Sequence, residues 1–128
     1  MRISHTAHQL YAHLTWATEA RLELVGDRVK KELGSIINEI ADAMGYEIIA
    51  FETVSDHVHL LVRYKPTHRI SDFIKMVKGK SSRVIPYLLN RPLSWQKGYG
   101  VTSVGPKSLR AAIRYVEQQR VHHPERNL

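Results

Sequence analysis

The sequence predicts an α+β fold, a single domain over residues 1–128 with a ferredoxin-like antiparallel sheet that carries helices. Apolar and polar residues alternate over residues 10–16, and a second β-rich run covers residues 56–62. Apolar residues recur three and four positions apart over residues 29–44 and 109–116, which is typical of amphipathic helices. Segments of both kinds follow one another in the order β-α-β-β-α-β-α, without a repeat or a linker.

The first half of the chain predicts a strand, a helix and a hairpin. The alternating residues 10–16 form the strand. Asp27 is expected to cap the helix, which Gly45 then stops. Residues 47–54 are rich in β-branched and aromatic side chains, and a tight turn at residues 55–56 leads into the second β-rich run. These two strands therefore form an antiparallel hairpin.

The second half predicts an interrupted helix, a short strand and a last helix. Residues 70–89 have helical apolar spacing, but Pro86 argues against one uninterrupted helix. We therefore expect a break between Gly79 and Pro86. Residues 101–104 predict a short strand, and a helix follows over residues 108–119.

The composition excludes two kinds of site and indicates a class of partner. The chain has no cysteine, which excludes disulfides and thiolate metal sites. No apolar run approaches the roughly 20 residues that span a bilayer, and the N-terminus lacks a signal-peptide core, so we expect a cytoplasmic protein. The formal net charge of +7 attracts phosphate backbones. Improved solubility is the alternative meaning of that charge.

Two histidines in the second β-rich run predict half of a metal site. Successive side chains of a strand point to opposite faces, so His57 and His59 project from the same face. Neutral imidazole is the commonest metal ligand in proteins. Two unrelated strand histidines are the alternative, unless a third ligand and a reactive group occur elsewhere in the chain.

Such groups occur in the last helix. Tyr115 lies off its apolar stripe, and Gln119 lies one turn further along the same face. A tyrosine near a metal ion can act as a nucleophile, and a glutamine carbonyl can bind a hard cation. A hydrogen-bonded tyrosine at the edge of the core is the alternative role of Tyr115.

These motifs stand in one order along the chain. The His-hydrophobic-His strand comes first, then the segment 95–100 with Ser103 and Val104, then the helical Tyr-x-x-x-Gln. In this order they resemble the HUH-type single-tyrosine transposases of single-stranded insertion sequences, over nearly the whole chain. The resemblance implies the ferredoxin-like fold and an enzyme that cuts and rejoins single-stranded DNA through a 5′-phosphotyrosine.

The resemblance also implies roles for single residues. Tyr115 is the expected nucleophile, and His57, His59 and Gln119 are the expected ligands of Mg²⁺ or Mn²⁺. The expected partner is single-stranded DNA with hairpin-forming ends. A catalytically silent or domesticated relative, which binds hairpin DNA or RNA without cleaving it, is the alternative.

Four cations are expected to contact DNA phosphates, and we call them the basic cluster. They are Lys75, Lys78, Lys80 and Arg83. A solvated helix face is the alternative meaning of such a run. His13 lies on the polar face of the first strand, where we expect a hydrogen-bonding strand histidine. An approach to His57 and His59, if the two strands are adjacent, is the alternative.

The last helix predicts a homodimer. A sheet already covered by two helices leaves little room for its apolar stripe, and an exchanged helix buries that stripe in a second copy. The resemblance implies the same arrangement, with Tyr115 and Gln119 of one chain completing the site of His57 and His59 in the other. Packing on the chain's own sheet is the alternative.

Overall fold

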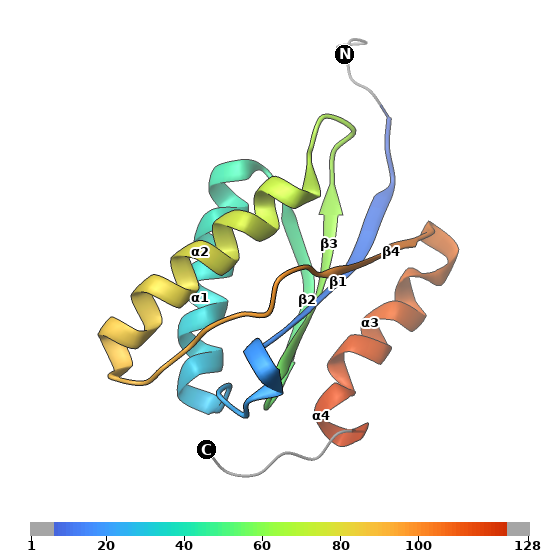
Figure 1. Ribbon diagram of the computed structural model, residues 1–128. Helices are drawn as coiled ribbons and strands as arrows, with labels where there is room; N and C mark the ends of the chain where they lie inside the picture. The colour runs from blue at the N-terminus through green and yellow to red at the C-terminus, as the bar shows by residue number, and fades with distance from the viewer. Residues whose placement is uncertain (1–6, 123–128) are drawn as a thin grey trace.

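The computed structural model describes residues 7–122, which form a four-stranded antiparallel sheet with helices on both faces. The strand order is β2-β3-β1-β4 (Figure 1). The strands are β1 (Leu10–Ala17), β2 (Glu47–Val54), β3 (His57–Tyr64) and β4 (Gly100–Val104). The predicted fold class and element order are confirmed, and β3, which carries the two histidines, is a central strand.

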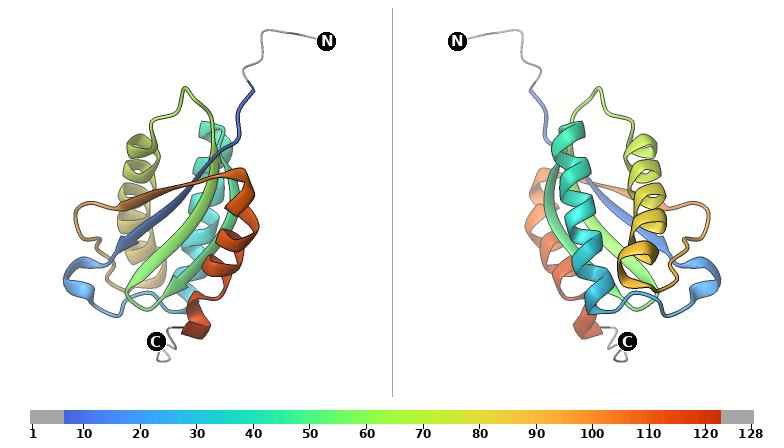
Figure 2. Two further views of the ribbon diagram at one scale, coloured as in Figure 1. Left: turned by 90° about the vertical axis from the view of Figure 1, so that its right-hand side faces the viewer. Right: turned by 90° about the vertical axis from the view of Figure 1, so that its left-hand side faces the viewer.

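Helices cover both faces of the sheet (Figure 2). On one face lie α1 (Asp27–Met44) and α2 (Ile70–Leu89), and on the other lie α3 (Leu109–Glu117) and the short α4 (Gln119–His122). Two 3₁₀ turns, η1 (Glu19–Arg21) and η2 (Pro106–Ser108), precede α1 and α3. None of the helices within residues 7–122 combines the length and the apolar character that a bilayer span requires.

The main core lies between the sheet and the α1–α2 pair. Leu14 of β1 and Leu60 of β3 are fully buried there against Leu33 of α1 and Phe73 of α2. Every second side chain of β1 and β3 belongs to this core, which explains the alternation in the sequence. The remaining side chains of the two strands, including the histidines, point to the opposite face.

A smaller core covers that opposite face. Leu61 of β3, Ala50 of β2 and Val116 of α3 are buried together. The partly buried residues that pack against them include the predicted stripe of the last helix: Leu109, Ala112 and Ile113. The expectation of limited room for this helix is wrong, because α1 and α2 occupy only one face and α3 packs on the other.

α2 runs without a break, so the predicted interruption between Gly79 and Pro86 is wrong. Pro86 lies in the last turn, where its missing N–H removes a single hydrogen bond, to the carbonyl of Ser82. The buried side of the helix is continuous across the predicted break, so packing holds the two halves as one: Phe73, Ile74, Val77, Ser81 and Ile85.

Only the C-terminal end of α1 matches the prediction. Gly45 ends the helix as expected, with φ of 84° and its N–H donated to the carbonyl of Ala41 at 2.8 Å. At the other end Gly26 occupies the cap position, and Asp27 is the first helical residue. The Asp27 carboxylate instead forms an ion pair with Arg120, 2.9 Å away.

Candidate active site

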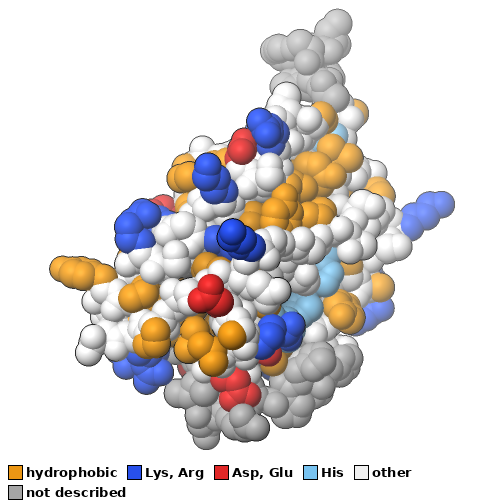
Figure 3. All heavy atoms as spheres, viewed as in Figure 1, with side chains coloured by type: hydrophobic (Ala, Val, Ile, Leu, Met, Phe, Trp, Pro, Cys, Tyr) orange, Lys and Arg blue, Asp and Glu red, His pale blue; other side chains and the backbone are white. Residues whose placement is uncertain are grey.

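His57 and His59 both project from the face that α3 covers, as the alternation along β3 predicts. His59 is 6% exposed and His57 is half-buried. Their ring centroids lie 4.9 Å apart, with the ring planes at 69°. Histidine side chains are visible at the surface on the face that Figure 3 shows.

Asp56 orients His57. The Nδ1 atom of His57 lies 2.7 Å from Oδ1 of Asp56, and Nε of Arg21 lies 3.0 Å from Oδ2. Burial acts to raise the pKa of Asp56, but hydrogen bonds from His57 and Arg21, together with their charges, outweigh burial and lower it. Because a carboxylate only accepts hydrogen bonds, His57 carries a proton on Nδ1.

β1 brings a third imidazole to the site. Nε2 of His13 lies 2.9 Å from Nδ1 of His59, and the two rings stack with centroids 5.1 Å apart. Burial lowers the pKa of His13, which favours its neutral form. The structure shows the alternative that was not favoured: His13 approaches the paired histidines from the adjacent strand, and its hydrogen bond is formed with His59 itself.

Tyr115 lies beside these imidazoles. Its ring meets His13 edge-on with centroids 5.6 Å apart and meets His59 edge-on at 6.0 Å. The side chain is 50% exposed, so solvent and solutes can reach it. The chain's own α3 therefore brings a phenol to the histidine pair.

Gln119 lies one turn beyond Tyr115, after a bend at Gln118 that separates α3 from α4. It is 1% exposed, and its Nε2 donates to the carbonyl of Tyr115 at 2.9 Å. Its Oε1 is buried and accepts no hydrogen bond from the residues that the structure describes. A buried amide oxygen of this kind is costly unless something binds it.

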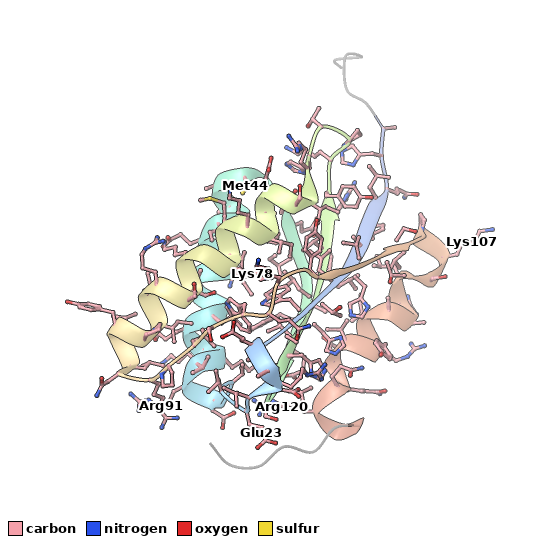
Figure 4. The ribbon with its side chains drawn as sticks, in the orientation of Figure 1. Glu23, Met44, Lys78, Arg91, Lys107 and Arg120 are labelled. Atoms are coloured by element: carbon pink, nitrogen blue, oxygen red, sulfur yellow. The ribbon has the colours of Figure 1, made fainter. Side chains whose placement is uncertain are left out.

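Arg120 anchors the segment that carries Gln119 (Figure 4). Its guanidinium lies 2.9 Å from Asp27 of α1 and 3.3 Å from Glu52 of β2, and its Nε donates to the carbonyl of Thr53 at 3.2 Å. These three contacts hold the end of α3 and the start of α4 against β2 and the start of α1.

The donor atoms in this region fit a divalent cation. Within residues 7–122, no three His, Cys, Asp or Glu side chains form a cluster that could hold a metal ion. A cation here would need donors of other kinds, and amide, water and substrate oxygens are kinds that divalent cations accept. Mg²⁺ and Mn²⁺ accept such mixed, partly external coordination.

An open pocket of about 410 Å³ adjoins the histidine pair. Its lining comes from β1, β3, Arg21 and the segment 96–100, and it includes both His57 and His59. Tyr115 and Gln119 are not part of the lining: Tyr115 meets His59 from α3, and Gln119 is buried at the start of α4. The pocket can hold a group of nucleotide size next to the histidines.

The basic cluster does not form one open cationic surface. Nζ of Lys78 donates to the carbonyls of Gln96 at 2.7 Å and Gly98 at 2.8 Å, which fixes the pocket wall to α2 (Figure 4). Lys80 forms an ion pair with Glu39 of α1. Lys75 and Arg83 are exposed, on the sheet face opposite the histidines. DNA contact by the cluster stays a prediction.

Three contacts at the candidate site were not predicted from the sequence. The adjacency of Asp56 to His57 was a usable signal for a carboxylate that orients a ligand. Lys78 gave no signal, since it acts through carbonyls of a distant loop. Arg120 gave none either, because its partners Asp27 and Glu52 are remote along the chain.

The sequence is similar to those of known proteins. The family described as "Transposase IS200 like" matches residues 6–119. The ISDra2 transposase TnpA of Deinococcus radiodurans is 32% identical over 119 residues, which cover 88% of this chain and 85% of that protein. The transposase for insertion sequence element IS200 of Salmonella typhimurium is 25% identical and covers 91% of this chain and 81% of its own.

Solved structures share the fold. A crystal structure from Deinococcus radiodurans R1, identified as a transposase, superposes with a TM-score of 0.73 and 32% identity, over 93% of this chain and 98% of that one. A REP-associated tyrosine transposase bound to a REP hairpin has a TM-score of 0.71 at 17% identity, over 96% of this chain and 73% of that one.

Proposed function

This chain belongs to the IS200-like transposase family, and from that premise we propose that it cuts and rejoins single-stranded DNA through a 5′-phosphotyrosine on Tyr115. In the cutting step the Tyr115 oxygen attacks phosphorus, the bond to the 3′ oxygen breaks, and a DNA 3′-hydroxyl is left. In the joining step a DNA 3′-hydroxyl attacks the phosphotyrosine and releases the tyrosine. The phosphodiester energy is conserved, so no nucleotide cofactor is consumed.

The position of Tyr115 is the observation that carries the proposal. Its half-exposed ring packs edge-on against His13 and against His59, one of the proposed ligands, with centroids 6.0 Å apart in the second case. The next turn of the same segment brings the buried, unsatisfied Oε1 of Gln119.

We further propose that His57, His59 and Gln119 hold Mg²⁺ or Mn²⁺. When bound, such a cation polarises the phosphoryl oxygens and orients the phosphate for in-line attack. The chain's own contribution is positioning. Asp56 fixes His57, Arg120 holds the Gln119 segment on β2, and the rings of His13 and His59 support the phenol from one side.

The proposed substrate is single-stranded DNA with hairpin-forming ends, handled in the cytoplasm by a homodimer with shared sites. The net charge of +7 and the presence of Arg21 and Lys97 in the lining of the pocket support a phosphate-rich ligand. The REP-associated relative was solved with a REP hairpin, but its likeness at 17% identity supports the fold alone. Hairpin recognition in this chain therefore rests on the family resemblance.

Covalent capture tests the nucleophile. The protein is incubated with Mn²⁺ and a labelled single strand that carries the ends of the element, and the adduct is resolved under denaturing conditions. Tyr115→Phe is expected to fold, bind the strand and form no adduct. Tyr87→Phe, which alters a phenol that is 87% exposed on α2, is the matched control and is expected to keep the adduct. An adduct in Tyr115→Phe would exclude Tyr115 as the nucleophile.

A further inference from the structure

The hydrogen bond between His13 and His59 decides which nitrogen of His59 presents a lone pair. A neutral imidazole has one N–H donor and one acceptor nitrogen. The two facing atoms, Nε2 of His13 and Nδ1 of His59, lie 2.9 Å apart and share one proton. If His13 supplies it, the second proton of the pair lies on Nε2 of His59. If His59 supplies it, Nε2 of His59 is an acceptor.

Only the second arrangement is compatible with a metal ion on His59. Nδ1 is engaged with His13 in both arrangements, so ligation falls to Nε2, which must then carry no proton. His57 offers a comparison within the same molecule. Its Nδ1 lies 2.7 Å from the carboxylate of Asp56, which cannot donate, so the proton of neutral His57 lies on Nδ1.

We propose that His13 is a positioning residue that accepts a hydrogen bond from Nδ1–H of His59 and thereby holds His59 in the tautomer that binds the metal ion through Nε2. This inference rests on the proposed metal site. His13 acts through His59 and contacts neither the metal ion nor the phosphate in this role. His13 thus orients His59 as Asp56 orients His57.

The surroundings of His59 make a protein acceptor necessary. His59 is 6% exposed, so water has little access to its ring, and a buried N–H without an acceptor destabilises the arrangement. Neutral histidine in water favours the opposite tautomer, with the proton on Nε2. The near-parallel stacking of the rings, at 19°, also fixes the direction in which Nε2 of His59 points.

The tautomer can be read by NMR without any cleavage assay. Side-chain nitrogens are labelled with ¹⁵N-histidine, and spectra are recorded with saturating Mg²⁺, which is diamagnetic, at a pH above the ordinary imidazole range. In the unmodified protein, Nδ1 of His59 is expected to carry the proton and Nε2 is expected to have the shift of a nitrogen that carries none. In His13→Leu the proton is expected to move to Nε2 of His59, which then releases the ion, while the proton of His57 stays on Nδ1 beside Asp56.

Calorimetry with Mn²⁺ supplies the second readout. His13→Leu is expected to bind Mn²⁺ about 10- to 100-fold more weakly, the range for lost partners of metal ligands. His13→Gln is expected to recover most of the affinity, because the Gln oxygen can accept at the position of the His13 Nε2 atom. The double variant His57→Ala with His59→Ala gives the reference for complete loss of the site.

The outcomes separate this inference from the proposed function. Equal Mn²⁺ affinity in His13→Leu and the unmodified protein, or a proton on Nε2 of His59 in the Mg²⁺-loaded protein, would overturn the role of His13 alone. Unchanged affinity in the double variant would instead overturn the metal site, and the inference with it. If His13→Gln behaved like His13→Leu, His13 would act through packing rather than as an acceptor.

Discussion

Gly100 of β4 lies directly opposite Thr15 of β1, and a Cβ atom on Gly100 would lie 2.6 Å from the Oγ1 atom of Thr15. This approach needs a residue without a side chain. Both residues line the pocket beside the histidines, so the contact determines how closely β4 and the preceding segment approach β1.

Gly100→Ala is therefore expected to reduce the free energy of unfolding by about 1–3 kcal/mol, the usual cost of overpacking. Adding Thr15→Ala removes Oγ1 and should recover most of that loss, which a double-mutant cycle by thermal unfolding measures. Gly105→Ala is the control, since a Cβ there would meet nothing within 4 Å. Strictly additive effects of the two substitutions would contradict the contact.

Tyr46→Phe is expected to stabilise the protein by about 1 kcal/mol at neutral pH. The ring stacks on Phe73 and His68 with centroids 4.4 and 4.0 Å away, but the buried hydroxyl has no hydrogen-bond partner in the described part of the chain. Removing it keeps the stacking and removes the desolvation cost. Chemical denaturation measures the change, and Tyr87→Phe, at an exposed site, should have no effect.

The Tyr46 hydroxyl also makes the stability of the protein depend on pH in the alkaline range. Burial, followed by the charges of Asp72 and Tyr64, raises the pKa of Tyr46 to about 12. The folded protein holds this proton more tightly than the unfolded chain does. The proton's contribution to the free energy of unfolding is therefore complete below the ordinary tyrosine pKa near 10. It is lost as pH rises from there through about 12. The free energy of unfolding of Tyr46→Phe should fall less than that of the unmodified protein over this pH range.

The exposed part of the basic cluster can be tested by the salt dependence of DNA binding. Lys75→Gln with Arg83→Gln should flatten the slope of log affinity against log salt by about 1.4 for single-stranded DNA, if both contact phosphates. Arg28→Gln with Lys31→Gln removes the same charge from exposed sites on α1 and is the control. A slope in Lys75→Gln with Arg83→Gln equal to that of the unmodified protein would mean that these two residues make no phosphate contact.

Sharing of active sites between two chains is tested by mixing variants. A Tyr115→Phe chain and a chain with His57→Ala and His59→Ala are each expected to be inactive alone. In a heterodimer with exchanged α3 helices, one site regains a tyrosine and both histidines, and partial cleavage should return. Exchange costs little because Val116 of α3 would meet Leu61 and Ala50 of the partner in the same way.

Gel electrophoresis of cleaved DNA measures the recovery. The heterodimer is verified with two different affinity tags before the assay. A verified heterodimer without cleavage would mean that α3 works on its own sheet, the packing seen in the single chain.

Local patterns predicted the elements that make the site. Alternation along β3 was enough to predict that His57 and His59 share a face, because side-chain direction in a strand depends only on position. Helical spacing was likewise enough to set Gln119 one turn after Tyr115. Each of these relationships involves residues close together in the chain.

Relationships between distant segments could not be predicted in the same way. The bond from His13 to His59 needs the pairing of β1 with β3, and the contacts of Lys78 need the path of the segment before β4. The uninterrupted α2 shows the same limit, since packing along its buried side outweighs the local effect of Pro86. The face that α3 covers was also fixed by tertiary packing.

The segment around the bend at Gln118 carries both the proposed nucleophile, Tyr115, and a proposed metal ligand, Gln119. Tyr115 and Gln119 are linked by a hydrogen bond and held at the far end by Arg120. A shift of α3 away from β3 would carry the phenol and the amide oxygen off together. The proposed nucleophile could therefore not move away while the proposed ion-binding site stayed intact. A displaced tyrosine that attacked a wrong phosphate would lack metal assistance, so this coupling would favour cleavage at the correct phosphate.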